Sequence, residues 1–170
     1  MVGLLPRLRR FARGLARDPY RADDLVQAAC ERALSRLDQL RDGSRLDSWL
    51  YRIIYTRWID DLRRAQTRAA KLTVISREQS PADAFRNPGA RMDAAIDMQK
   101  ALSALPEEHR AALLLVGGEG YSYADAASVL DVPPGTVASR VARARSMLHR
   151  ILSDRQSGII RAVKSKGMEE

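Results

Sequence analysis

Cysteine and histidine are nearly absent from this sequence, which leaves little material for catalysis or metal binding. Among 170 residues the only cysteine is Cys30 and the only histidines are His109 and His149. A lone thiol cannot form an internal disulfide, so we expect Cys30 in the core of a cytoplasmic protein. No metal-ligand spacing, phosphate-binding loop or catalytic cluster is evident. We therefore expect a protein that is not an enzyme and uses no cofactor or metal.

Long apolar runs and aromatic residues are also scarce. No run of about 18 apolar residues occurs, and arginines interrupt the apolar residues near the N-terminus, so we expect neither a signal peptide nor a membrane span. Aromatic residues make up only 5% of the chain, whereas alanine, leucine and arginine dominate. Because these three are strong helix formers, the composition predicts an all-α fold without a sheet.

Acidic residues are outnumbered by basic ones. Lysine and arginine total 29 against 21 aspartates and glutamates, which leaves a net charge of +8. A basic protein gains free energy from a polyanion through counterion release, so nucleic acid is the leading candidate partner. A solubility function or binding to a membrane surface would use the same charge.

Three stretches at the start of the chain have the apolar spacing of helices, at residues 4–16, 21–37 and 47–64. They predict one compact helical domain over residues 1–65. From residue 66 to 91 the periodicity is lost, and Pro81 and Asn87-Pro88-Gly89 interrupt the chain. This composition is typical of a flexible linker between domains.

The second half predicts another helical domain, over residues 92–153, followed by a basic tail at 154–170. Leu105-Pro106-Glu107-Glu108 resembles a helix start, and the glycines at 117–120 are better read as a helix stop than as a ligand cradle. Ser122 and Asp125 have the spacing of a capping box. A tight turn at 131–135 then separates a short helix from a long one, which is the arrangement of a helix-turn-helix.

Charge changes sign at the start of that long helix. Residues 93–135 contain two bases and seven acids, whereas residues 136–166 contain eight bases and one acid. A helix that enters a negatively charged groove gains from this segregation, and a merely solvated helix does not require it. The pattern therefore favours DNA as the ligand of the second domain.

From about residue 5 to residue 152, two motif blocks resemble the extracytoplasmic-function sigma factors of the sigma-70 family. The first block resembles region 2 and consists of Ala22-Asp23-Asp24-Leu25-Val26-Gln27, Trp49-Leu50-Tyr51-Arg52-Ile53 and Ile59-Asp60-Asp61-Leu62-Arg63-Arg64. The resemblance implies that Asp23, Asp24 and Gln27 contact the core RNA polymerase. An alternative is that Asp23 and Asp24 are first-turn acids stabilised by the helix dipole.

The same resemblance implies a minus-10 DNA surface. Residues 41–48 correspond to the family's specificity loop, which captures a flipped base and needs polar side chains to do so. Basic residues interleaved with rings would bind single-stranded DNA in the helix after this loop, although Trp49 and Trp58 are more often core residues. The expected minus-10 residues are Arg41, Asp42, Ser44, Arg45, Ser48, Trp49, Arg52, Thr56, Arg63 and Arg64.

The second block resembles region 4, whose helix-turn-helix reads the minus-35 element. It comprises Leu105–Arg110, Gly120–Ala127 and Gly135–Arg145. In the long helix, Val137, Val141, Ala144 and Leu148 have the spacing of a core face. The residues expected to contact DNA are Thr136, Ser139, Arg140, Arg143 and Arg145, of which Arg145, like Arg150, would also suit a phosphate contact or a solvated charge.

Two positions depart from the family pattern. Thr56 stands where asparagine is usual and lacks its amide donor and acceptor, and Ala138 stands where a basic residue is common. We therefore expect that the promoter sequences typical of the family do not predict the minus-10 and minus-35 sequences that this chain prefers.

The resemblance implies a non-enzymatic sigma factor that recruits core polymerase to specific promoters and melts DNA at minus-10. Its partners would be the polymerase core, at the beta-prime clamp and beta flap, promoter DNA and an anti-sigma factor. A sigma-mimicking adaptor would keep the fold but bind only the anti-sigma factor. A one-domain regulator that uses only the helix-turn-helix would leave the first block unexplained. The basic tail at 154–170 is expected to be an extra DNA contact or disordered.

Overall fold

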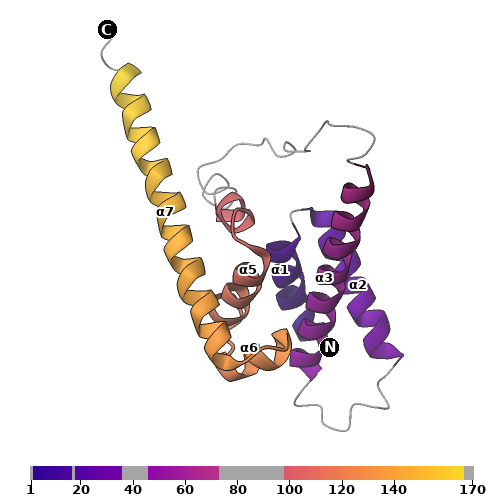
Figure 1. Cartoon of the computed structure of the whole chain (residues 1–170). Coiled ribbons are helices and arrows are strands. Elements are labelled where there is room, and N and C mark those ends of the chain that lie inside the picture. The colour runs from indigo at the N-terminus through magenta and orange to yellow at the C-terminus, as the bar shows by residue number, and fades with distance from the viewer. Residues whose placement is uncertain (1, 17, 36–45, 73–97, 167–170) are drawn as a thin grey trace. The chain divides into compact units, whose positions relative to one another are not determined.

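The protein is described by a computed structural model that covers residues 2–16, 18–35, 46–72 and 98–166 (Figure 1). Every regular element within these ranges is a helix, which confirms the all-α prediction. The chain divides into two compact units, Met1–Ile96 and Asp97–Glu170. Much of the expected linker, and most of the loop at 41–48, lie outside the described residues.

The first unit is built from three helices, α1 (Leu5–Leu15), α2 (Pro19–Leu34) and α3 (Leu46–Leu72), preceded by a short turn of 3-10 helix, Val2–Leu4. Asp18 caps α2, since its carboxylate accepts a hydrogen bond from the Tyr20 backbone N–H at 3.0 Å. Pro19 is next, in the first helical position, where its missing N–H costs nothing. These two residues explain why α2 begins where it does.

The core of this unit lies where α1 and α2 meet α3. Phe11 of α1 packs edge-to-face on Tyr51 of α3, with ring centroids 5.0 Å apart, a favourable geometry for two aromatic rings. Each of the three helices contributes buried apolar residues on one side, including Leu8, Leu15, Leu25, Ala29, Leu50, Ile54 and Trp58. The apolar spacing in the sequence thus corresponds to one shared core.

The second unit contains α5 (Glu107–Leu113), a π turn (Leu114–Gly118), α6 (Tyr123–Leu130) and α7 (Pro134–Lys166), with helical residues 98–103 before them. Both α5 and α6 pack against the first half of α7, and the rest of α7 continues past them (Figure 1). The interface is formed by small and medium apolar side chains, among them Ala111, Ala112, Val129, Val137, Val141 and Ala144. The helix-turn-helix expected from the sequence is present.

Both ends of α6 have clear chemical causes. The Ser122 Oγ accepts a hydrogen bond from the Asp125 backbone N–H at 3.1 Å, which confirms Ser122 as the N-cap, and it donates to Asp125 Oδ2 at 2.5 Å, so the Asp125 carboxylate bonds to the Ser122 hydroxyl. At the other end Asp131 adopts the left-handed conformation, with φ 58° and ψ 48°. This residue turns the chain toward α7.

The second unit adds two features to the sequence prediction. The helix ends at the glycines as predicted, but its last turn, which includes Gly117 and Gly118, is a π turn in which the Glu119 N–H donates to the Leu114 carbonyl at 2.9 Å, and Gly120 follows with φ 76°. The helix expected to end near Leu152 continues as backbone to Lys166. Among the described helices none is both long enough and apolar enough to cross a membrane.

Candidate polymerase and nucleic-acid interfaces

The acidic face of α2 is exposed and lies beyond the helix start. Asp23 and Asp24 are both exposed, and because α2 begins at Pro19 neither stands in its first turn. The helix-dipole alternative therefore gains no support from the structure. Gln27, also exposed, donates a hydrogen bond from Nε2 to Glu31 Oε1 at 3.0 Å.

Large apolar side chains border this acidic face. Tyr20 is 81% exposed and Leu34 is 60% exposed, the two highest values among the large hydrophobic residues described. Tyr20, Asp24, Gln27, Glu31 and Leu34 succeed one another at intervals of three or four residues and so share one side of α2. Sequence reasoning identified the polar centre of this stripe and missed its apolar ends.

The expected minus-10 residues are distributed unevenly. Arg41, Asp42, Ser44 and Arg45 lie outside the described residues. Ser48 and Trp49 are half-buried in the first turn of α3, where the Ser48 backbone N–H donates to Asp47 Oδ1 at 2.7 Å. Further along α3, an exposed set consists of Arg52, Thr56, Arg63 and Arg64.

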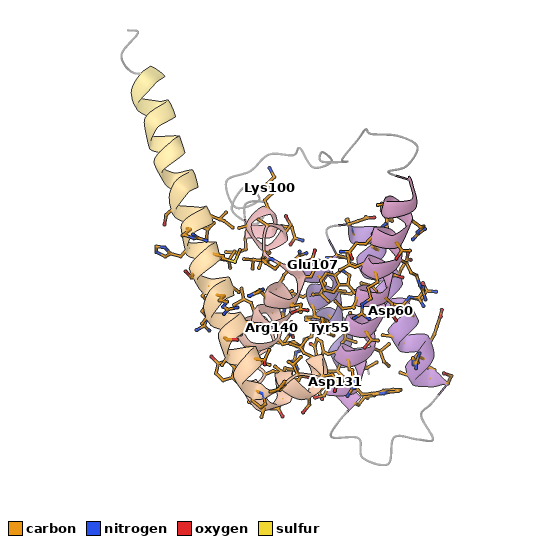
Figure 2. The ribbon with its side chains drawn as sticks, viewed as in Figure 1. Tyr55, Asp60, Lys100, Glu107, Asp131 and Arg140 are labelled. Atoms are coloured by element: carbon orange, nitrogen blue, oxygen red, sulfur yellow. The ribbon has the colours of Figure 1, made fainter. Side chains whose placement is uncertain are left out.

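The aromatic residues of α3 divide into core and surface. Trp58 and Tyr51 are buried, so Trp58 belongs to the core. Trp49 and Tyr55 are half-buried, and the Tyr55 ring centroid lies 6.2 Å from that of Trp58 (Figure 2). Among these four rings of α3, Trp49 and Tyr55 therefore retain surface on which a base could stack.

Asp61 lies between two arginines on the exposed side of α3. Its carboxylate is 3.8 Å from Arg57 Nε and 3.7 Å from Arg64 Nη1. Pairs of this kind at the surface are weak, so both arginines remain able to exchange the carboxylate for a phosphate. Asp61 was missed as a site residue, although its spacing to both arginines was visible in the sequence.

The start of α7 presents a polar surface. Ser139 and Arg143 are exposed and lie one turn apart, and Thr136 is half-buried, with its carbonyl accepting a hydrogen bond from Ser139 Oγ at 2.9 Å. Arg145 is also exposed. Neither Arg143 nor Arg145 forms an ion pair with a described residue. Both side chains are therefore available to an external partner.

Arg140 is placed differently from the other arginines of α7. Its Nη2 donates to Glu108 Oε2 of α5, in an ion pair that joins the two helices. The Arg140 side chain is only 15% exposed, whereas that of Glu108 is 57% exposed. Sequence reasoning missed Glu108, because nothing in the local pattern pairs residues so far apart.

Arg110 is the most deeply buried charged residue in the described part of the second unit. Its side chain is 2% exposed, and Nη2 donates to the Leu105 carbonyl at 3.0 Å and lies 4.0 Å from Glu107 Oε1. It thereby joins α5 to the end of the preceding segment. This arginine is structural, and sequence reasoning assigned it no such position.

Nothing in the described ranges suggests a metal site, since no three histidine, cysteine, aspartate or glutamate residues there gather around one point. The surfaces described above offer charged groups, hydrogen-bonding groups and two half-buried rings. They are therefore suited to macromolecular binding.

Family comparisons match both halves of the chain. Residues 2–68 match the family described as Sigma-70 region 2, and residues 95–148 match the family described as Sigma-70, region 4. The chain is 38% identical over 154 residues to the ECF RNA polymerase sigma factor EcfG of Rhodopseudomonas palustris, which covers 89% of this chain and 82% of the relative. It is 39% identical to the ECF RNA polymerase sigma factor SigM of Mycobacterium tuberculosis, with 89% and 74% covered.

Solved structures give the same fold. The sigma factor RpoE of Bartonella quintana, solved with the anti-sigma factor NepR, matches with a TM-score of 0.73, 31% identity and coverage of 89% of this chain and 93% of that one. The PhyRSL–NepR complex of Sphingomonas sp. Fr1 matches with a TM-score of 0.58 and 25% identity, over 88% and 84% of the two chains. The anti-anti-sigma factor PhyR of Bartonella quintana shares the fold at 18% identity and a TM-score of 0.56, covering 87% of this chain and 47% of that one.

Proposed function

The chain belongs to the extracytoplasmic-function sigma factors of the sigma-70 family, transcription initiation factors that direct RNA polymerase to promoters, and we propose how its exposed residues perform that task. The observation that carries the proposal is that an acidic face on α2 and a basic face on α7 are both exposed in one chain. One face suits the polymerase and the other suits DNA. The two helical units then act as region 2 and region 4 domains joined by the segment between them.

The polymerase core docks on α2. Asp23 and Asp24 supply negative charge beyond the first turn. Gln27 supplies a side-chain amide, which donates a hydrogen bond to the Glu31 carboxylate. Charged groups at the surface of an interface steer association and fix orientation. We assign the beta-prime clamp to this face, and the beta flap to the region 4 domain, by analogy with the family.

The minus-35 element is read by the N-terminal half of α7. Arg143 and Ser139 form the centre of that surface, with Thr136 before them and Arg145 at a phosphate, because these polar side chains lie on the accessible part of the helix. Arg140 lies at the edge of the same surface, paired with Glu108.

The minus-10 element is bound by the exposed side of α3 together with the loop before it. Arg52, Thr56, Arg63 and Arg64 are exposed there, and the half-buried Trp49 lies beside Ser48 at the start of the helix. Cationic groups near a partly exposed ring suit single-stranded DNA, where each base offers a face for stacking. The loop residues Arg41, Asp42, Ser44 and Arg45 complete this set as the base-capturing loop.

An anti-sigma factor is the third partner. RpoE of Bartonella quintana, which resembles this chain over most of its length, was solved with the anti-sigma factor NepR. We propose that a comparable small protein covers the polymerase- and DNA-binding faces here. The protein would act in the cytoplasm, where its polymerase and promoters are found.

A sigma-mimicking adaptor is the alternative, because PhyR, named an anti-anti-sigma factor, shares this fold. The observation against it is the exposed Arg143, unpaired among the described residues, beside Ser139, since an adaptor that never meets DNA has no use for that surface. The sigma factors EcfG, SigM and RpoE are also more similar in sequence to this chain.

The deciding experiment is run-off transcription with purified polymerase core on DNA taken from upstream of the protein's own gene. We expect transcripts only when the chain is added. Asp24→Ala should reduce core binding, whereas the matched control Asp24→Glu keeps the charge and should retain it. Arg143→Ala should cost roughly 1–3 kcal/mol of promoter binding if it reads a base, whereas Arg150→Ala should cost less. Tight binding of a small inhibitor protein without any core binding would establish the adaptor instead.

A further inference from the structure

The ion pair between Glu108 and Arg140 joins two helices that lie far apart in the sequence. Glu108 is the second residue of α5, and Arg140 lies in the second turn of α7. One terminal nitrogen of the Arg140 guanidinium donates to the Glu108 carboxylate. The other terminal nitrogen is buried and has no hydrogen-bond partner within the described part of the chain. The guanidinium is thus held between the helices.

This geometry is unsuited to reading a base. An arginine that recognises guanine directs a pair of N–H groups outward to O6 and N7. In Arg140 one terminal nitrogen is engaged and the other has no accessible surface. Its neighbours on the helix, Val137 and Ala144, are fully buried, which places Arg140 on the flank of α7 that faces the domain core.

Most of the buried surface between α5 and α7 is apolar. Apart from Arg110, the buried residues of α5 and of the first half of α7 are small or β-branched, with Ala111 and Ala112 on one side and Val137, Val141 and Ala144 on the other. Hydrophobic burial is non-directional, so it contributes less to fixing the register of two helices than a hydrogen bond does. Arg140 is the mostly buried member of the pair and Glu108 the exposed one, and their hydrogen bond favours the register of the two helices in which the two groups meet.

We infer that Glu108 and Arg140 form a clasp that sets the orientation of α7 on α5 and thereby aims Arg143, Ser139 and Thr136 into the DNA groove. Arg140 is then a positioning residue and makes no base contact. Glu108 becomes a residue required for promoter recognition, although it is acidic. This inference rests on the proposed function, since it explains what orients the residues that contact the minus-35 element.

The substitution Glu108→Gln distinguishes the clasp from a direct DNA contact by Arg140, because the two possibilities predict opposite changes in DNA affinity. Removal of a negative charge near DNA, and release of an arginine toward it, would by electrostatics alone strengthen binding. If the pair positions α7, the same substitution weakens binding of holoenzyme to the minus-35 element by about tenfold, equivalent to about 1.4 kcal/mol. Arg140→Gln should weaken it equally without reducing the salt dependence of binding.

The charge exchange Glu108→Arg with Arg140→Glu provides the second arm and leaves the net charge unchanged. A clasp is restored by reversal of its two charges, so the double variant should recover most of the promoter affinity and keep the base preference of the wild type. Glutamate cannot make the base contacts of an arginine. If Arg140 reads a base, the double variant should therefore bind worse than either single variant. Arg143→Gln serves as the contact control, expected to lower both affinity and salt slope.

Thermal unfolding of each variant shows that the binding assays compare folded proteins. Tighter binding by Glu108→Gln, or failure of the exchange to recover affinity in a folded protein, would overturn the clasp while the wild type still supports transcription. Failure of the wild type to transcribe with core would overturn the proposed function itself. The two failures are therefore distinguishable.

Discussion

Three arginines of the second unit have physically different environments. Arg110 is buried and bonded to a backbone carbonyl, Arg140 is held in a clasp, and Arg143 is exposed and unpaired among the described residues. The cost of removing a side chain depends on what it leaves unsatisfied, more than on its charge. Substitutions of these three arginines should therefore have quite different effects.

Removal of Arg110 should destabilise the second unit. Arg110→Ala leaves a cavity and deprives the Leu105 carbonyl of its donor, so we expect a loss of about 2–4 kcal/mol in the free energy of unfolding. Urea denaturation followed by circular dichroism measures it. The exposed Arg150→Ala should change that free energy by no more than about 0.5 kcal/mol. Equal effects of the two substitutions would show that Arg110 has no structural function.

The left-handed conformation of Asp131 limits which residues can stand at the end of α6. A β-branched residue fits poorly at φ 58°, so Asp131→Val should cost about 1–2 kcal/mol of stability. Asparagine tolerates this conformation, and Asp131→Asn should be nearly neutral. Thermal unfolding of both variants gives the comparison. A valine variant as stable as the wild type would mean that the turn rearranges at no cost.

Among the elements, α7 combines a recognition surface with a long extension. It has 33 residues, which at about 1.5 Å per residue makes it about 50 Å long. When the first turns of such a helix lie in the major groove, its remaining turns extend beyond the groove. Only its first half packs against α5 and α6.

Truncation after Leu152 tests whether the extension binds the promoter. Because residues beyond it continue along the axis of α7, away from Arg143, we expect unchanged minus-35 affinity and an unchanged salt slope. Titration of promoter DNA at several salt concentrations measures both quantities. Arg143→Gln should reduce the slope by about one in the same assay. A comparable reduction on truncation would assign the basic tail to DNA.

The elements also show how far sequence reasoning reaches. Apolar spacing predicted the helices, and Ser122 with Asp125 predicted the start of α6, because caps and helix faces depend on residues three or four apart. The Glu108–Arg140 pair and the burial of Arg110 depend on tertiary packing, which local spacing does not encode. Trp58 was recognised as a possible core residue, but only the packed structure distinguishes it from the half-buried Trp49.

At the scale of the molecule, each unit has a core of its own. Leu8, Phe11 and Tyr51 belong to the first, and Leu115, Val129 and Val141 belong to the second. Units with separate cores can fold separately. The sequence predicted two domains because the apolar periodicity is lost between residues 66 and 91.

A fragment that begins at residue 92 should therefore fold alone. We expect a helical circular dichroism spectrum with one cooperative thermal transition, and binding to minus-35 DNA that Arg143→Gln weakens in the fragment as it does in the full chain. Gel-shift or anisotropy titrations with the isolated element provide the measurement. A fragment that lacks a cooperative transition would show that the second unit depends on the first.

The π turn at Leu114–Gly118 accommodates one residue more than an α-helical turn requires. A helix can hold one extra residue in such a turn while the helix on either side stays regular. The Glu119 and Tyr121 N–H groups bond to the Leu114 and Leu115 carbonyls, so the backbone is satisfied despite the extra residue. Deletion of one residue within Leu114–Gly118 should therefore convert this segment to regular α-helix.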